Sequence, residues 1–198
     1  MEDLQSLLAE SARHHDHLCP RQVLGVRLGL RGLRWLKLEP NRGSKRLLLI
    51  SETDGCFVDG LIAATGCAVG HRTLRVEDYG KTSATFVDTK TGQAIRVAPT
   101  RDIRQRSFAF MQGELDHYLG QLRAYQIMPD DEMFTVQPVT LNVPFEEIVS
   151  LPGMRAICSL CGEEIMNERE VRRNAVTLCR ACAGEACYYQ PDGSAAPV

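Results

Sequence analysis

Four cysteines near the C-terminal end constrain the fold of this chain more than any other feature. They form two Cys-x-x-Cys pairs, Cys158 with Cys161 and Cys179 with Cys182, and 17 residues lie between the pairs. This spacing is typical of a structural zinc module, because two residues between thiolates let one tight turn present both sulfur atoms to one ion. Gly162 can take the positive φ that closes such a turn. We predict that these four cysteines bind zinc in a small treble-clef or zinc-ribbon domain.

The segment around these cysteines has too few large apolar residues for a hydrophobic core of its own. Bound structural zinc contributes roughly 10–16 kcal/mol, which would supply the missing stability. A helix beginning at Ala181 would place its positive end beside bound thiolate. The alternative, four free or redox-active cysteines, fits the paired spacing less well.

Turn-forming residues divide the chain before this segment, at Pro144, Pro152 and Gly153. We therefore predict an α+β core domain over residues 1–150, a tetracysteine zinc finger over 154–190 and a flexible tail over 191–198. In the core, helices are expected to pack on a mainly antiparallel sheet. Its predicted strands include a hairpin of residues 84–88 and 93–97 around a Thr-Gly turn.

Helical patterns in the core carry two further expectations. Pro20 suits the first position of a helix, which makes Cys19 its N-cap. In this helix three glycines share one face, which predicts a closely packed neighbour, and the opposite face is expected to be solvated. The glycines are Gly25, Gly29 and Gly32, and the arginines of the opposite face are Arg27, Arg31 and Arg34. We also expect Asp54 to cap a helix over 55–65, and one helix to carry the apolar stripe from Phe108 to Leu122.

Charge and hydropathy narrow the class of protein. The chain has 23 Lys and Arg against 25 Asp and Glu, so the overall charge gives no reason to expect a nucleic acid or an anionic membrane as partner. Arginines interrupt the longest apolar stretch, residues 23–38, and the acidic N-terminus does not resemble a secretory signal. We expect a cytoplasmic protein with no membrane span, whose eight cysteines serve as metal ligands or reactive thiols.

A second group of metal-ligating residue types lies in the N-terminal half. His15, His17 and Cys19 alternate along a segment that Pro20 favours as extended, so the three side chains would point the same way. Cys56 falls in the first turn of the next predicted helix. One hypothesis is that His17, Cys19 and Cys56 meet in a cleft, as ligands of a second transition metal or as a nucleophilic thiol with its base. The alternative is buried cysteines and surface histidines.

At these residues the chain resembles a known family. The runs H-D-H-L-C-P (15–20), D-G-C-F-V-D (54–59), T-G-C-A-V-G (65–70), D-Y-G-K (78–81) and F-V-D-T-K-T-G (86–92) are similar, in this order, to blocks of the FmdE family, which takes its name from formylmethanofuran dehydrogenase. The resemblance covers about residues 10–145. It implies an α+β core that dimerises and, in some members, a C-terminal treble-clef zinc finger. Asp16 and Arg21 depart from it, since both replace glycines.

The same resemblance implies a site and a class of partner. It places His17, Cys19, Cys56 and Asp59 at an active or metal-binding site, with Cys56 and Asp59 as candidate catalytic residues and Cys67 as a further candidate. The implied partner is a molybdenum or tungsten enzyme that handles a formyl group or formate.

We weigh three functions on this basis: a metal-binding accessory or subunit protein of such an enzyme, which we favour, a free-standing metal- or thiol-dependent enzyme, and a zinc-finger interaction module on a dimeric core. An enzyme of the thiol type requires a pKa of Cys56 well below about 8.5. Nucleic acid is not expected at the finger, because its five arginines are offset by five glutamates.

Overall fold

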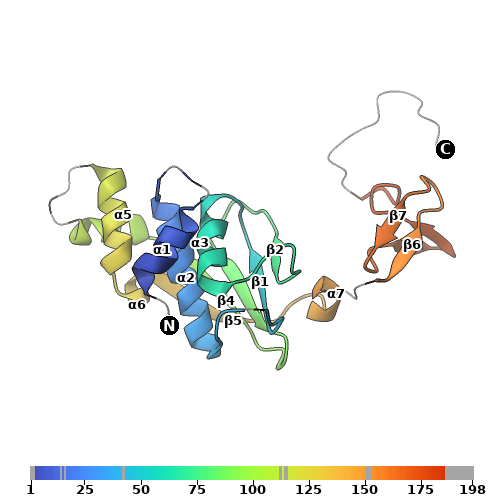
Figure 1. Cartoon of the computed structure of the whole chain (residues 1–198), viewed down its shortest axis with the longest axis horizontal. Coiled ribbons are helices and arrows are strands. Elements are labelled where there is room, and N and C mark those ends of the chain that lie inside the picture. Colours follow the sequence, from blue (N-terminus) through green and yellow to red (C-terminus); the bar gives the residue numbers. More distant parts are fainter. Residues whose placement is uncertain are drawn as a thin grey trace. The chain divides into compact units, whose positions relative to one another are not determined.

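The computed structural model describes residues 3–13, 15, 17–41, 43–111, 113, 116–149 and 153–185. Its contacts divide the chain into two compact units, Met1–Asn142 and Val143–Val198. The first unit combines helices with a mainly antiparallel sheet, and the second contains short strands and the four paired cysteines (Figure 1). The predicted fold class is confirmed.

A five-stranded sheet forms the base of the first unit. Its strands are β1 (Leu47–Ser51), β2 (Leu74–Val76), β3 (Ala84–Asp88), β4 (Ala94–Pro99) and β5 (Phe134–Val139), in the order β2-β1-β3-β4-β5. β1 and β2 are parallel, and all other neighbours are antiparallel. The predicted hairpin is β3–β4, and its turn contains Gly92 at φ 74°.

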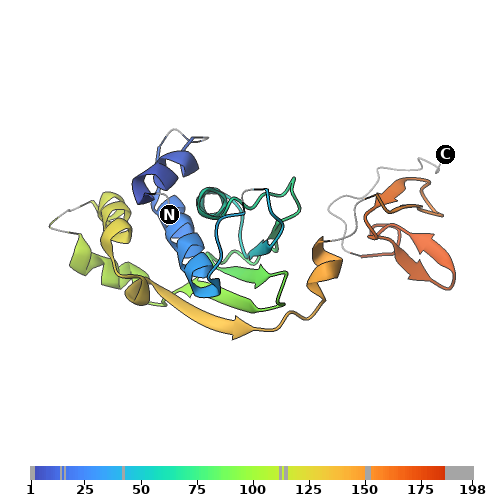
Figure 2. The same cartoon turned by 60° about the horizontal axis from the view of Figure 1, so that its bottom comes forward.

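Helices cover one face of this sheet (Figure 2). They are α1 (Leu4–Ser11), α2 (Pro20–Leu36) and α3 (Cys56–Thr65). The core lies between these helices and the sheet, where Phe57 and Leu61 of α3 and Phe86 and Ile95 of the sheet are fully buried. The chain then continues through α4 (Ile103–Ser107), the short 3-10 helix η1 (Phe108–Phe110), α5 (His117–Ile127) and α6 (Asp130–Met133).

The glycine face of α2 is the contact face of the helix, as its spacing predicts. A Cβ atom added to Gly29 would lie 2.7 Å from Cβ of Ala64 on α3, and one added to Gly32 would lie 2.5 Å from the ring of Phe86. Both distances are below the contact distance of two carbon atoms. Glycine is therefore needed here for close packing.

The opposite face of α2 is not solvated throughout, and the expectation for Arg27 is wrong. Arg27 is 9% exposed and donates hydrogen bonds to the carbonyl oxygens of Tyr125, Gln126 and Met128 at 2.6–3.0 Å. It also pairs with Asp130 at 2.8 Å. The last carbonyls of a helix have no partners within it, so a buried guanidinium at the end of α5 satisfies both groups.

Two other local predictions are corrected. The apolar stripe after residue 108 does not run along one helix, because Asp116 caps a new one by accepting from the backbone N–H groups of Tyr118 and Leu119. α3 is capped by Gly55 rather than Asp54. Gly55 has φ 70°, a conformation that L side chains rarely adopt.

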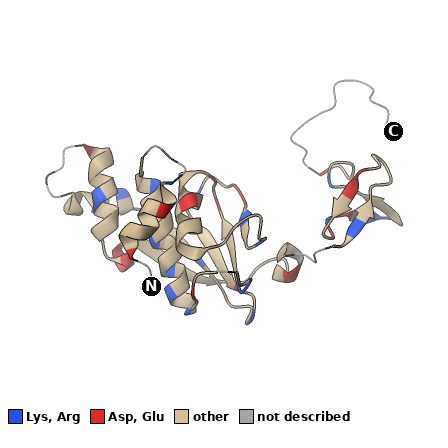
Figure 3. Cartoon of the chain, in the orientation of Figure 1, with Lys and Arg blue, Asp and Glu red and all other residues tan. Residues whose placement is uncertain are grey.

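The second unit contains α7 (Phe145–Val149) and two hairpins. One hairpin pairs β6 (Arg155–Ile157) with β7 (Glu164–Met166), and the other pairs β8 (Val171–Arg173) with β9 (Val176–Leu178). Residues 180–184 form a turn in place of the expected start of a helix, and the rest of that helix lies outside the described residues. Lys and Arg are interspersed with Asp and Glu in both units (Figure 3).

Candidate metal sites

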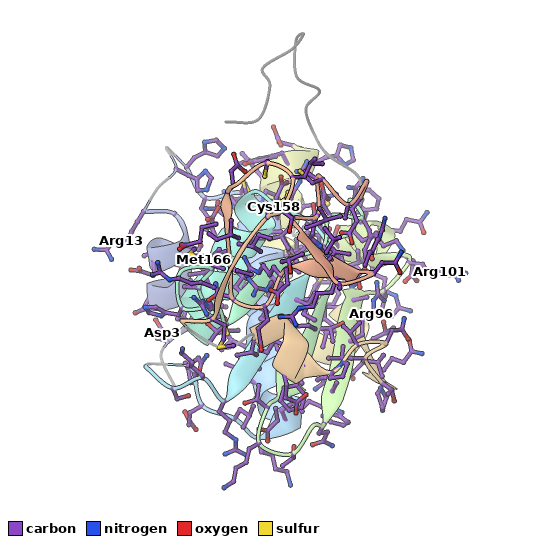
Figure 4. All side chains as sticks on the ribbon, turned by 90° about the vertical axis from the view of Figure 1, so that its right-hand side faces the viewer. Asp3, Arg13, Arg96, Arg101, Cys158 and Met166 are labelled. Atoms are coloured by element: carbon purple, nitrogen blue, oxygen red, sulfur yellow. The ribbon has the colours of Figure 1, made fainter. Side chains whose placement is uncertain are left out.

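The two Cys-x-x-Cys pairs form one cluster in the second unit. Cys158 follows β6, and the chain turns back at Gly162, whose φ is 74° and whose N–H donates to the carbonyl oxygen of Cys158 at 3.0 Å. The Ser159 N–H donates to the carbonyl oxygen of Thr177 on β9 at 2.8 Å, which joins this turn to the hairpin that leads to Cys179. All four sulfur atoms lie within 4.8 Å of one another (Cys158 is labelled in Figure 4).

Backbone hydrogen bonds prepare one of these sulfurs to carry a negative charge. The pKa of Cys158 is lowered to about 6, chiefly by backbone hydrogen bonds from Cys161 and Cys179. The pKa of Cys182 is raised to about 12, first by its hydrogen bond with Cys179 and then by burial. Without an ion, the cluster thus combines one thiolate with thiols that retain protons. A cation is needed to ionise all four.

The distances in the cluster fit zinc. A tetrahedron of zinc–sulfur bonds of about 2.3 Å has edges of roughly 3.8 Å. Sγ of Cys161 lies 4.0 Å from Sγ of Cys179, which are members of different pairs. Four sulfur donors at this spacing are the ligand set of structural zinc sites. The arrangement can hold an ion but leaves no ligand position for a substrate.

In the first unit, the thiol of Cys19 is placed by the start of α2. Cys19 is the N-cap of this helix, as predicted, and its N–H donates to Oε1 of Gln22 at 2.7 Å. The amide nitrogen of Gln22 in turn donates to the carbonyl oxygen of Ser11 at the end of α1. Gln22 is fully buried, so it fixes the connection between the two helices and holds Cys19 in position.

The thiol of Cys56 meets that of Cys19. Cys56 is the first residue of α3, and its pKa is raised by burial, then by a hydrogen bond with Cys19 and by the charge of Cys19. Asp59 raises it further. The structure therefore brings together two of the predicted residues that are 37 positions apart in the sequence. The direction of the shift is opposite to that required of a metal-free thiol nucleophile.

Histidine enters this group in a different way from the prediction. Nε2 of His15 lies 2.7 Å from Oδ2 of Asp59, and the two side chains are 30% and 34% exposed. His17, the predicted ligand, lies instead beside Tyr118 of α5, with 6.5 Å between ring centroids. The charges of Cys19 and Cys56, together with burial, raise the pKa of Tyr118, so this phenol also belongs to the group.

Sequence reasoning missed Tyr118, and no local motif marks it. It lies about 100 positions from His17 and is brought close only because α5 starts next to the first residues of α2 and α3. Its nearest sequence signal is the N-cap Asp116 two residues earlier. We call the six residues His15, His17, Cys19, Cys56, Asp59 and Tyr118 the core cluster.

Cys67 does not join the core cluster. α3 ends at Thr65, and Gly66 stops it in the left-handed conformation at φ 67°. Cys67 is fully buried beyond this end, with its Sγ 3.7 Å from the carbonyl oxygen of Leu47. Burial raises the pKa of the Cys67 thiol. Within the described residues, the four paired cysteines are the group whose ligand atoms already lie within 4.8 Å of one another.

Comparisons with known proteins agree with this division of the chain. The model of the prokaryotic dksA/traR C4-type zinc finger matches residues 153–186, so the C-terminal part is a zinc finger of the C4 type. A solved structure, a tungsten formylmethanofuran dehydrogenase FmdE-like protein from Syntrophus aciditrophicus, superimposes with a TM-score of 0.63 at 19% identity. The match covers 95% of this chain and 96% of that one. At this identity the likeness establishes the fold.

A curated relative is similar in sequence over most of the chain. It is a probable S-adenosyl-L-methionine-binding protein of Archaeoglobus fulgidus, 34% identical over 204 aligned positions that include 94% of this chain. The chain spans about half the length of that relative, 54%.

The family itself is defined by the first unit. The model of the family described as FmdE, molybdenum formylmethanofuran dehydrogenase operon, matches residues 14–135, which include the whole core cluster. This stretch is more than half of the sequence, and the chain therefore belongs to the FmdE family.

Proposed function

We propose that this protein is a metal-binding accessory or subunit protein of a molybdenum or tungsten enzyme that handles a formyl group or formate. The observation that carries the proposal is the contact between the thiols of Cys19 and Cys56, held at the first residues of two helices. Two thiols that share a proton are separated readily by a soft or borderline cation, which takes the place of the proton.

In this proposal the core cluster binds a second transition metal. Cys19 and Cys56 supply thiolates, and a histidine, His17 or His15, supplies the imidazole. This donor set suits zinc, nickel or iron. The positive ends of α2 and α3 stabilise the two thiolates. The contact of Asp59 with Nε2 of His15 supports a particular arrangement, since a carboxylate that accepts from one ring nitrogen leaves the other, Nδ1, as a lone-pair donor.

The zinc finger has a structural role in this proposal. Zinc bound by Cys158, Cys161, Cys179 and Cys182 holds two short hairpins together, which have little apolar surface to bury. We further propose that the protein is a homodimer through its core. In the described residues, no helix has the length and apolar composition that a membrane span requires.

A second candidate function is favoured by the match to the dksA/traR C4-type finger. In that case the finger recognises another protein and the core is a platform for it. Large apolar side chains are exposed on the finger, among them Ile157 and Met166 on the same face of the β6–β7 hairpin (Met166 is labelled in Figure 4). A free-standing thiol enzyme is favoured less, because the pKa of Cys56 is raised.

Metal analysis of purified variants tests the main proposal. We expect two metal ions per wild-type chain, loss of the core metal alone in Cys56→Ala, and loss of zinc alone in Cys158→Ser. Cys67→Ala, which removes a buried thiol outside both sites, is the matched control and retains both ions. A Cys56→Ala variant with the full metal content contradicts the core site.

The role as an accessory protein is tested separately, by isolation of the tagged protein from its native cells. We expect a molybdenum or tungsten enzyme to co-purify with the wild-type chain, and the isolated chain to show no turnover of formate. Formate turnover by the chain alone contradicts this part of the proposal, whatever its metal content.

A further inference from the structure

A pocket in the first unit lies outside the core cluster. It has a cavity volume of about 250 Å³ and is enclosed by α1, the C-terminal half of α2, residues 38–40 and α3. Its walls share no residue with the core cluster. α2 is 17 residues long, and a helix rises 1.5 Å per residue, so its two ends are roughly 25 Å apart. The pocket is at one end and Cys19 is at the other.

The walls of the pocket are hydrocarbon. Leu7 of α1, Leu33 of α2 and Ala64 of α3 line it, although each is less than 5% exposed. Leu38 lines it from the segment after α2, and it is 9% exposed. A pocket of this kind does not hold water well, because its walls offer no hydrogen bonds, and apolar cavities of about 150 Å³ are known to stay dry and bind small hydrocarbons.

The rim of the pocket is charged. Arg34 and Lys37 of α2 and Glu39 reach it. Arg34 is held by Asp130, which also pairs with Arg27. These five side chains comprise three cations and two carboxylates, so the rim has one excess positive charge. Among the described residues Lys37 has no ion-pair partner, and its backbone lies in the left-handed conformation at φ 55° where α2 ends.

From these observations we infer that the pocket binds a small amphipathic carboxylate, with the hydrocarbon part between α1, α2 and α3 and the carboxylate at Lys37. The volume sets the size of the ligand. At roughly 30 Å³ per water-sized group, 250 Å³ accommodates on the order of eight such groups. A saturated carboxylate of about eight carbon atoms therefore fits, and its charge complements that of the rim.

Calorimetric titration of the full-length protein tests this inference with three probes of equal chain length: octanoate, 1-octanol and octylamine. We expect octanoate to bind at least tenfold more tightly than octanol, and octylamine to bind more weakly than both. Equal binding of the three probes overturns the assignment of the carboxylate to Lys37. Absence of octanoate binding overturns the pocket as a ligand site.

Two variants locate the bound probe. Lys37→Glu should weaken octanoate at least tenfold and leave octanol unchanged, and this exposed substitution does not disturb the core. Leu30→Trp fills the pocket from its partly buried wall and should abolish binding of both probes. Ile62→Trp is the matched control, since Ile62 is 36% exposed on α3 and does not line the pocket.

Sedimentation velocity separates this inference from the case in which a second copy of the chain covers the pocket. The oligomeric state should be the same in the wild type and in Leu30→Trp, with and without octanoate. If Leu30→Trp dissociates the protein and octanoate does not bind the wild type, the pocket is part of an interface between copies and the inference is wrong.

Discussion

Gly25 of α2 and Gly60 of α3 lie backbone against backbone. A Cβ atom added to Gly25 would be 2.1 Å from the carbonyl oxygen of Phe57, and one added to Gly60 would be 2.3 Å from the carbonyl oxygen of Gln22. This contact occurs close to the start of both helices, within six residues of Cys19 and four of Cys56. The crossing of the two helices thus sets the positions of the two thiols of the core cluster.

Replacement of Gly60 by alanine should therefore destabilise the protein, although alanine favours a helix by about 1 kcal/mol over glycine. The added methyl group meets backbone atoms that cannot move independently, and such overpacking costs about 1–3 kcal/mol or more. We expect a net loss of about 1–2 kcal/mol in the free energy of unfolding, measured with denaturant. Gly70→Ala is the control, since no atom lies within 4 Å of its added Cβ. An unchanged stability of Gly60→Ala would show that the helices separate easily.

Arg27 should stabilise the first unit through the end of α5. Arg27→Met removes a buried guanidinium that donates to three carbonyl oxygens, and leaves those oxygens without a partner. Breaking a buried network of this kind costs about 3–5 kcal/mol. The measurement is chemical unfolding, with Arg21→Met, an exposed position of the same helix, as the control. A loss below about 1 kcal/mol for Arg27→Met contradicts the role of the network.

Asp88 makes stability depend on pH in the acid range. Its carboxylate accepts two hydrogen bonds from Arg46 at 2.8 and 3.0 Å, and this contact lowers the pKa of Asp88 to about 2. Because the pKa is lower in the folded state, the stabilisation is complete above about pH 4 and is lost as the pH falls through 2. It amounts to about 2 kcal/mol.

Comparison of two variants tests this assignment. The stability of Arg46→Met should decrease less than that of the wild type between pH 4 and pH 2. Arg106→Met is the control, because the side chain of its partner Asp102 is 45% exposed and their ion pair contributes little. Identical acid dependence in Arg46→Met and the wild type would assign the effect to another carboxylate.

Zinc binding to the finger should release protons in a pattern set by its thiols. The pKa values of Cys161 and Cys182 are raised, so at pH 7 these two thiols hold protons that the ion must displace. Cys158, with a pKa of about 6, contributes a further proton only in more acid solution. We expect at least two protons per zinc at pH 7 and a larger number at pH 5.5, measured in weakly buffered solution with a pH indicator. Release of fewer than two at pH 7 rules out this ligand set.

The sequence determined features that depend on neighbours along the chain. Two residues between paired cysteines, a proline after Cys19 and a glycine in the turn of the β3–β4 hairpin each restrict the local backbone. The glycine spacing of α2 also predicted a close contact, because residues three or four apart share one face of a helix. These features sufficed for the fold class, the N-cap at Cys19 and the zinc finger.

Only the tertiary structure decided which distant side chains meet. It paired His15, not His17, with Asp59, placed Tyr118 beside the thiols and separated Cys67 from them. It also buried Arg27, which the pattern of its own helix assigned to solvent. The physical reason is that the periodicity of a helix shows which residues share a face but not what packs on that face. Partners from segments tens of residues away are fixed by the packing of the whole unit.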